Sequence, residues 1–119
     1  MGGSGIYNEF QGGYMDGYIA AIAQDGSQLI YSTYLGTEND DQCHLIQVDK
    51  SDSIYIAGQT NGDWPIIGNV RYDEFAGQYI VKISPQLEVV ELSTVFGSEF
   101  SFETQISPVA FLVDDCGHV

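Results

Sequence analysis

The most constraining feature of this sequence is an internal repeat. Residues 18–22 and 29–36 align without a gap with the residues 61 positions later. Residues 7–10 and 45–49 align with segments 65 positions later. One structural unit therefore recurs at a period of about 60 residues, which predicts a chain built from similar modules placed side by side.

Each copy of the repeat has the pattern of β-strands. Segments of five to eight residues are rich in Ile, Val, Tyr, Phe and Thr and are bounded by Gly, Asp, Asn, Ser or Pro, which is typical of strands. No apolar spacing of helical period extends over three turns. The predicted strands are 17–23, 28–35, 44–49, 54–59, 78–84, 88–96 and 105–113, with one more beginning at His118.

Two short polar segments are predicted to be hairpin turns. They are Asp25-Gly26 and residues 50–53, since Asp and Gly tolerate the positive φ that tight hairpins require. Strands joined by such short connections pair antiparallel. The sequence therefore predicts antiparallel sheets made from neighbouring strands.

Four antiparallel strands make one blade of a β-propeller, and the strands predicted here are too few to close a ring of blades. We therefore expect an all-β fold of antiparallel four-stranded blades, as a fragment of about two repeats, in residues 17–119. Residues 1–16 are expected to be a glycine-rich N-terminal segment and loop. Because a repeat unit buries its apolar face only against its neighbours, we expect this chain to pack against other blades or to associate with itself.

The charge balance excludes several classes of partner. The chain has 17 acidic and 3 basic residues and a formal net charge of −14. Nucleic-acid binding needs Lys or Arg to neutralise phosphates, so neither DNA nor RNA is expected as a partner. No apolar run approaches the roughly 20 residues that span a bilayer, so no membrane insertion is expected. The N-terminus lacks the basic and apolar regions of a signal peptide. Either the protein is cytosolic, or this chain is a piece of a longer one whose export signal lies elsewhere.

The most concentrated acidity lies in one predicted loop. Glu38, Asp40 and Asp41 could supply oxygen ligands for a hard cation such as Ca²⁺. Their spacing matches neither an EF-hand loop nor a calcium-binding nonapeptide repeat, and a solvated loop is the alternative interpretation. No other cofactor is predicted.

Aromatic side chains are candidates for recognition of a protein or a glycan, because rings stack on sugars and anchor protein interfaces. Trp64, in a Gly-Asp-Trp-Pro segment, is the candidate exposed anchor, and Tyr34 is a second candidate. The alternative is that Trp64 and Pro65 fill the gap between blades. Packing between sheets is expected for Tyr18, Tyr31, Tyr55 and Tyr79.

Asp49 and Asp114 occupy equivalent positions of the two copies, each before a turn. An Asp side chain can accept hydrogen bonds from backbone N–H groups two residues on, so both are predicted to stabilise turns.

No residue pattern indicates catalysis, and we expect this chain not to be an enzyme. Cys43 and His44 are adjacent, but neighbouring residues of a strand point to opposite faces, so they should not form a nucleophile and its base. Two cysteines, the other being Cys116, are too few for a disulfide framework. No spacing singles out a pair of carboxylates suited to glycoside hydrolysis.

Several segments together resemble a known family. Residues 31–36, 40–41, 46–60 and 63–65 look like the bacterial seven-bladed β-propeller repeat, often abbreviated SBBP. Residues 107–117 are similar to a variant found in large surface proteins of Bacteroidetes, which carry gliding-motility-associated domains and leave the cell by type IX secretion. The sequence departs from the family pattern at Asp52-Ser53, where the repeat usually has Gly-Asn, and the second copy lacks the acidic pair.

The resemblance implies an exported, extracellular propeller module without catalytic activity, for protein or carbohydrate interaction or for scaffolding. Two alternatives remain open at this point. The chain could belong to a propeller enzyme that acts on polysaccharide, with its catalytic residues on other blades. It could also be a structural spacer of an adhesin.

Overall fold

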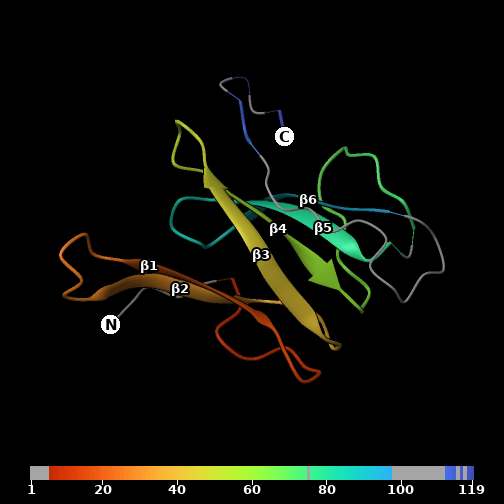
Figure 1. The fold of residues 1–119 in the computed structure, drawn as a ribbon, viewed down its shortest axis with the longest axis horizontal. Helices are drawn as coiled ribbons and strands as arrows, with labels where there is room; N and C mark the ends of the chain where they lie inside the picture. Colours follow the sequence, from red (N-terminus) through yellow and green to blue (C-terminus); the bar gives the residue numbers. More distant parts are fainter. Residues whose placement is uncertain (1–5, 75, 98–111, 115, 117) are drawn as a thin grey trace.

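The computed structural model describes residues 6–74, 76–97, 112–114, 116 and 118–119. Within these residues the secondary structure consists of antiparallel strands without a helix (Figure 1). The all-β prediction is therefore confirmed, and the described residues contain no helix that could cross a membrane. The strands are β1 (Gly17–Ile22), β2 (Leu29–Leu35), β3 (Asp41–Val48), β4 (Ile54–Thr60), β5 (Gln78–Ile83) and β6 (Val90–Phe96).

The strands form two sheets. The hairpin β1–β2 is a sheet of its own, and the other strands form a four-stranded sheet in the order β3-β4-β5-β6. All strand pairings are antiparallel and join strands that are consecutive in the chain. Isolated antiparallel bridges also join Tyr7 to Tyr34 of β2 and Ile67 to Ser93 of β6. A four-stranded antiparallel meander is the arrangement expected of one complete blade.

Both predicted hairpin turns are confirmed. Gly26 has φ of 75° and its N–H donates to the Ala23 carbonyl oxygen at 2.8 Å. Asp52 has φ of 63° and its N–H donates to the Asp49 carbonyl oxygen at 3.0 Å. Asp at this position tolerates the left-handed conformation that the turn between β3 and β4 needs.

The boundaries predicted for β1 to β6 agree with the structure within two residues, except at the start of β3. β3 begins at Asp41 rather than at residue 44, because Asp41 still pairs with Thr60 of β4. The pairing is irregular between Cys43 and Leu45, so His44 is an extra residue in the strand. Most of the predicted strand 105–113 lies outside the described residues, and His118 and Val119 are not in a strand.

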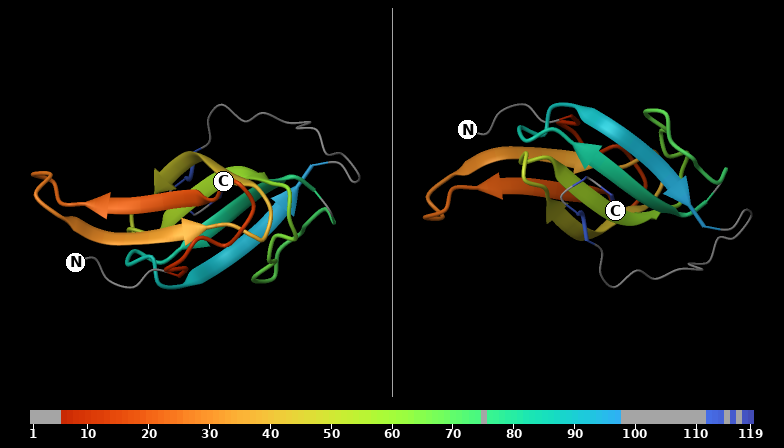
Figure 2. Two further views of the ribbon diagram at one scale, coloured as in Figure 1. Left: turned by 90° about the horizontal axis from the view of Figure 1, so that it is seen from below. Right: turned by 90° about the horizontal axis from the view of Figure 1, so that it is seen from above.

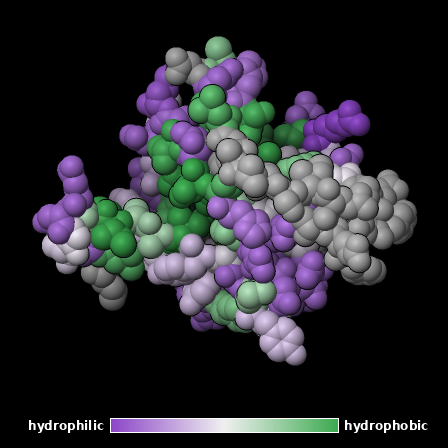
Figure 3. Space-filling view, in the orientation of Figure 1, coloured by the Kyte–Doolittle hydropathy of each residue, from purple (hydrophilic) through white to green (hydrophobic). Residues whose placement is uncertain are grey.

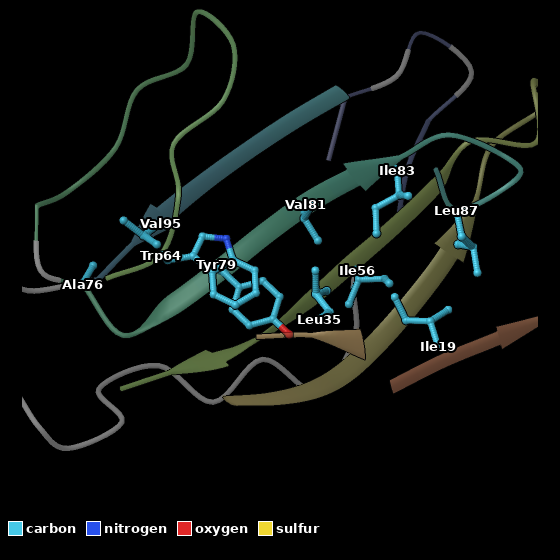
Figure 4. Close-up of a cluster of buried hydrophobic side chains, with 10 residues drawn as sticks. All are labelled: Ile19, Leu35, Ile56, Trp64, Ala76, Tyr79, Val81, Ile83, Leu87 and Val95. Carbon is cyan, nitrogen blue, oxygen red and sulfur yellow. The ribbon is translucent and has the colours of Figure 1, made fainter. Parts of the chain in front are cut away.

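The hairpin packs on one face of the four-stranded sheet (Figure 2). Ile19 and Leu35 of the hairpin belong to the same buried cluster as Ile56, Val81 and Ile83 of the sheet (Figure 4). Each of these five side chains is at most 6% exposed. The core of the molecule is therefore the interface between the hairpin and the sheet, rather than the interior of either one. The same cluster also contains Trp64, Ala76, Tyr79, Leu87 and Val95.

Candidate functional site

The face of the hairpin that points away from the sheet is apolar and exposed. We call it the outer face, formed by Tyr18, Ala20 and Ile22 of β1 with Ser32 and Tyr34 of β2. Tyr18 and Ile22 are 52% and 61% exposed. Apolar side chains gather at the free end of the hairpin, at the left of Figure 3. An exposed apolar face of this kind marks a candidate interaction surface.

The predicted binding residue Tyr34 lies in an aromatic cluster at one end of the outer face. Its ring centroid is 5.3 Å from that of Tyr18 and 6.3 Å from that of Phe10, in both cases edge to face. These rings line an open concavity of about 560 Å³, together with Tyr14, which is 93% exposed. Gln42 and His44 of β3 also line it and supply polar groups.

The prediction that Trp64 is an exposed anchor is wrong. Its side chain is 8% exposed and its indole stacks on the Tyr79 ring, with centroids 3.7 Å apart and planes 8° from parallel. The indole N–H donates to Ser93 Oγ at 2.8 Å, and that hydroxyl donates to the Pro65 carbonyl oxygen at 2.6 Å. Trp64 therefore closes one end of the core, as in the alternative interpretation.

The three predicted metal ligands do not converge. Glu38 is exposed, and Asp40 Oδ1 accepts a hydrogen bond from the Tyr14 N–H at 2.6 Å. Asp41 is 1% exposed, and its Oδ2 accepts from the N–H and the hydroxyl of Thr37 at 2.6 Å and 2.9 Å. Among the residues that the structure describes, no three His, Cys, Asp or Glu side chains could hold a metal ion together.

Asp41 lies instead beside Asp16, which the sequence did not single out. A Cβ added to Gly36 would meet carboxylate oxygens of both residues. The only sequence signal for this contact is that Asp16 directly precedes the predicted strand of one hairpin arm and Gly36 directly follows the other. A paired hairpin places these two ends together.

The predicted turn residues Asp49 and Asp114 make equivalent hydrogen bonds. Asp49 Oδ1 accepts from the N–H groups of Ser51 and Ser53 at 2.8 and 3.0 Å. Asp114 Oδ1 accepts from those of Cys116 and His118, both at 2.8 Å. The hydrogen bonds from His118 and Cys116 lower the pKa of the Asp114 carboxyl. Both aspartates therefore hold their turns by accepting backbone hydrogen bonds, as the repeat predicts.

Cys43 is half-buried, a free thiol like Cys116, and is held against Tyr79. The Cys43 sulfur lies 3.3 Å from Tyr79 Oη, and the Tyr79 hydroxyl donates to the Gln42 carbonyl oxygen at 2.9 Å. Burial raises the pKa of both the Cys43 thiol and the Tyr79 phenol. The thiol therefore stays protonated at neutral pH and serves as a packing contact.

Comparison with known proteins gives one match. Residues 30–64 match the family model of the β-propeller repeat, SBBP. The matched segment runs from β2 through β3 and β4 to Trp64, so it begins in the hairpin and ends in the four-stranded sheet. No curated protein and no solved structure shows detectable similarity. The all-β fold, an antiparallel four-stranded sheet with a hairpin, therefore contains a β-propeller repeat.

Proposed function

We propose that this chain is a noncatalytic interaction and scaffold module of an exported, extracellular surface protein, and that the outer face of β1–β2 receives another blade. A propeller repeat associates with other blades, because each blade covers the apolar face of its neighbour. The observation that carries the proposal is a difference in burial between equivalent residues of the two copies.

The repeat makes the comparison residue by residue. Tyr18, Ala20 and Ile22 of β1 correspond to Tyr79, Val81 and Ile83 of β5. The three residues of β5 are at most 1% exposed and belong to the buried cluster that also contains Ile19 and Leu35 of the hairpin. The Tyr79 ring is covered by Trp64. The three residues of β1 are exposed. Equivalent positions, two of which carry the same side chain, are therefore buried in one copy and exposed in the other. We infer that a second blade covers the exposed copy.

The free energy at stake is substantial. Burying an aromatic or large aliphatic side chain is worth about 1.5–3 kcal/mol relative to leaving it exposed. Tyr18 and Ile22, which are 52% and 61% exposed, each gain part of this free energy when a blade covers the outer face. Tyr34, at the position of buried Val95, lies on the same face and adds to it.

The oligomeric mass of the full chain in solution tests this proposal. Sedimentation equilibrium should show association that strengthens with concentration, and Ile22→Asp should abolish it by placing a charge on the outer face. Val89→Asp is the matched control, because Val89 is 57% exposed but lies in the turn between β5 and β6. A compact monomer at every concentration would contradict the proposal.

A second candidate function is glycan binding at the aromatic concavity. The specific observation in its favour is the combination of the Phe10, Tyr14 and Tyr34 rings with the polar side chains of Gln42 and His44 around one open concavity. Rings with neutral hydrogen-bonding groups suit a sugar face and its hydroxyls.

NMR titration with neutral oligosaccharides tests this second function. Shifts should concentrate on the concavity and disappear in Tyr14→Ala. Tyr72→Ala should retain them, because Tyr72 is 51% exposed but does not line this concavity. Shifts that are spread evenly over the surface would argue against a glycan site.

The extracellular location is proposed from the resemblance to exported propellers and from the scarcity of basic residues. Fractionation of the native cells, with an antibody against this chain, should find it on the surface or in the medium. Recovery in the cytosolic fraction would contradict that part of the proposal.

A further inference from the structure

Two aspartates at the junction of the hairpin and the sheet each have a buried oxygen without a hydrogen-bond partner. These atoms are Asp16 Oδ1 and Asp41 Oδ1. Asp41 as a whole is 1% exposed, and both aspartates lie in the wall of the open concavity described above. A buried carboxylate oxygen without a donor is costly, because it has lost its hydration and gained nothing in return.

The two carboxylates flank the backbone of Gly36. A Cβ at this position would lie 2.5 Å from Asp16 Oδ1 and 3.1 Å from Asp41 Oδ2. A methyl group would therefore collide with Asp16, and only glycine lets both carboxylates approach the chain here. Two side chains from different parts of the sequence are thus brought to one point.

Each aspartate uses its second oxygen to hold a loop. Asp16 Oδ2 accepts a hydrogen bond from the Gln11 N–H, and Asp41 Oδ2 accepts two from Thr37. The remaining oxygens, both Oδ1, are free to act as ligands. The loops themselves are in contact, since the Asp41 N–H donates to the Met15 carbonyl oxygen at 2.8 Å.

No basic side chain neutralises this pair in the described residues. The chain has three, Lys50, Arg71 and Lys82. Lys82 pairs with Glu91 at 3.1 Å, and the other ion pair joins His118 to Asp114. Neighbouring buried carboxylates without a counter-ion are unfavourable, so the charge balance of the site calls for an external cation.

The equivalent junction of the second copy has a different arrangement of polar groups. At the equivalent junction of the second copy, Gly97 replaces Gly36 and Gly77 replaces Asp16. There a Cβ on the glycine would meet the neutral Gln78 Oε1 at 3.1 Å. A carboxylate is present there too, since the Gly97 N–H donates to Asp73 Oδ2 at 3.3 Å. In the described part of the chain, the buried carboxylate oxygens without a donor, Asp16 Oδ1 and Asp41 Oδ1, both belong to the first junction.

We propose that Asp16 and Asp41 bind a divalent calcium-type cation through their Oδ1 atoms, and that this cation joins the loop before β1 to the loop before β3. Ca²⁺ suits the site better than Mg²⁺, because it accepts irregular sets of carboxylate, carbonyl and water oxygens, whereas Mg²⁺ demands a near-ideal octahedron. This site differs from the set of Glu38, Asp40 and Asp41, of which it shares one member. The proposal of this cation site does not depend on which partner covers the outer face.

The test measures Ca²⁺ binding and thermal unfolding of the full chain after treatment with EDTA. Isothermal titration with CaCl₂ should show one site. Ca²⁺ at about ten times its dissociation constant should raise Tm by roughly 5 °C. Asp16→Asn and Asp41→Asn should each remove most of the binding heat and of the Tm increase. Glu38→Gln is the matched control, an exposed carboxylate of the same loop, and should retain both effects.

Asp41 also accepts two hydrogen bonds from Thr37, so Asp41→Asn could fail to fold. In that case the Ca²⁺ binding and Tm of Asp16→Asn test the proposal. Two results would overturn the proposal. One is that CaCl₂ changes Tm no more than NaCl of equal ionic strength. The other is that Ca²⁺ binds Asp16→Asn as tightly as it binds the original chain. If both Asn variants are also more stable than the original chain in EDTA, the buried oxygens are unfavourable charges without a ligand.

Discussion

The hairpin β1–β2 and the strand pair β5–β6 are two copies of one sequence unit in two environments. They have the same antiparallel pairing, with a register irregularity in the last pair of each, at Ile22 and at Ile83. Tyr79 is 0% exposed and its counterpart Tyr18 is 52% exposed. The burial of the two equivalent tyrosines therefore depends on what packs against each strand pair, which for Tyr79 includes Trp64, and not on the strand's own sequence.

Truncation of the two equivalent tyrosines should give the largest difference between the copies. Tyr79→Ala removes the stack with Trp64 and leaves a cavity in the core, so it should lower the free energy of unfolding by about 3–5 kcal/mol. Tyr18→Ala in the dilute monomer should change it by less than about 0.5 kcal/mol. Urea denaturation followed by circular dichroism gives both values. Equal losses would mean that the outer face is covered within a single chain.

The equivalent serines should show a smaller difference of the same sign. Ser93 is 1% exposed and bridges the Trp64 indole to the Pro65 carbonyl group. Ser93→Ala leaves both partners unsatisfied and should cost about 1–3 kcal/mol. Ser32→Ala, at the same position of the first copy, should cost less than about 0.5 kcal/mol in the same urea experiment. A larger cost at Ser32 would contradict the assignment of the outer face.

Substitution of the equivalent turn aspartates, Asp49 and Asp114, tests whether the two copies also differ in the stability that their turns contribute. Asp49→Ala frees the N–H groups of Ser51 and of buried Ser53, and should destabilise the chain by about 1 kcal/mol. Asp114 makes the same hydrogen bonds at an exposed site, and Asp114→Ala should cost less than about 0.5 kcal/mol. Thermal melts of the two variants at one pH compare them directly. A greater loss at Asp114 would show that its turn stabilises more of the fold than that of Asp49.

Alkaline pH should affect the covered copy more than the exposed one. Because burial raises the pKa values of Cys43 and Tyr79, the folded chain favours their protonated forms. Their contribution to stability is complete below the ordinary thiol pKa and declines as the pH rises above about 9. Tyr79→Phe should reduce this decline, and Tyr18→Phe should not. Denaturation curves at neutral and alkaline pH measure it, and the same decline in both variants would refute the account.

The fold could be predicted from local information. Segments rich in β-branched and aromatic residues, the turn residues that bound them and the period of the repeat located the strands β1 to β6 and the turns after Ala23 and Asp49. These signals work because pairing in a meander involves neighbouring segments. The start of β3 was placed too late, since Asp41 and Gln42 are polar and carry no strand signal of their own.

The site residues depend on contacts that no local pattern encodes. The Gly-Asp-Trp-Pro segment has the composition of an exposed loop, but Trp64 is buried by Tyr79 and Ser93, which come from two later strands. Asp16 and Asp41 meet only because the hairpin folds back and leads into β3. Clustering of acidic residues in the sequence therefore did not locate the proposed cation site, because its two aspartates are 25 positions apart.

Hydroxyl-radical footprinting at increasing protein concentration tests the central claim most directly, because it reports the accessibility of both copies in one sample. In the dilute chain, Tyr18 and Ile22 should be oxidised rapidly while Tyr79 and Ile83 are protected. As the concentration rises, Tyr18 and Ile22 should become protected, and exposed Tyr72 should remain reactive. Oxidation of Tyr18 at the same high rate at every concentration would contradict the assignment of the outer face as a blade-packing surface.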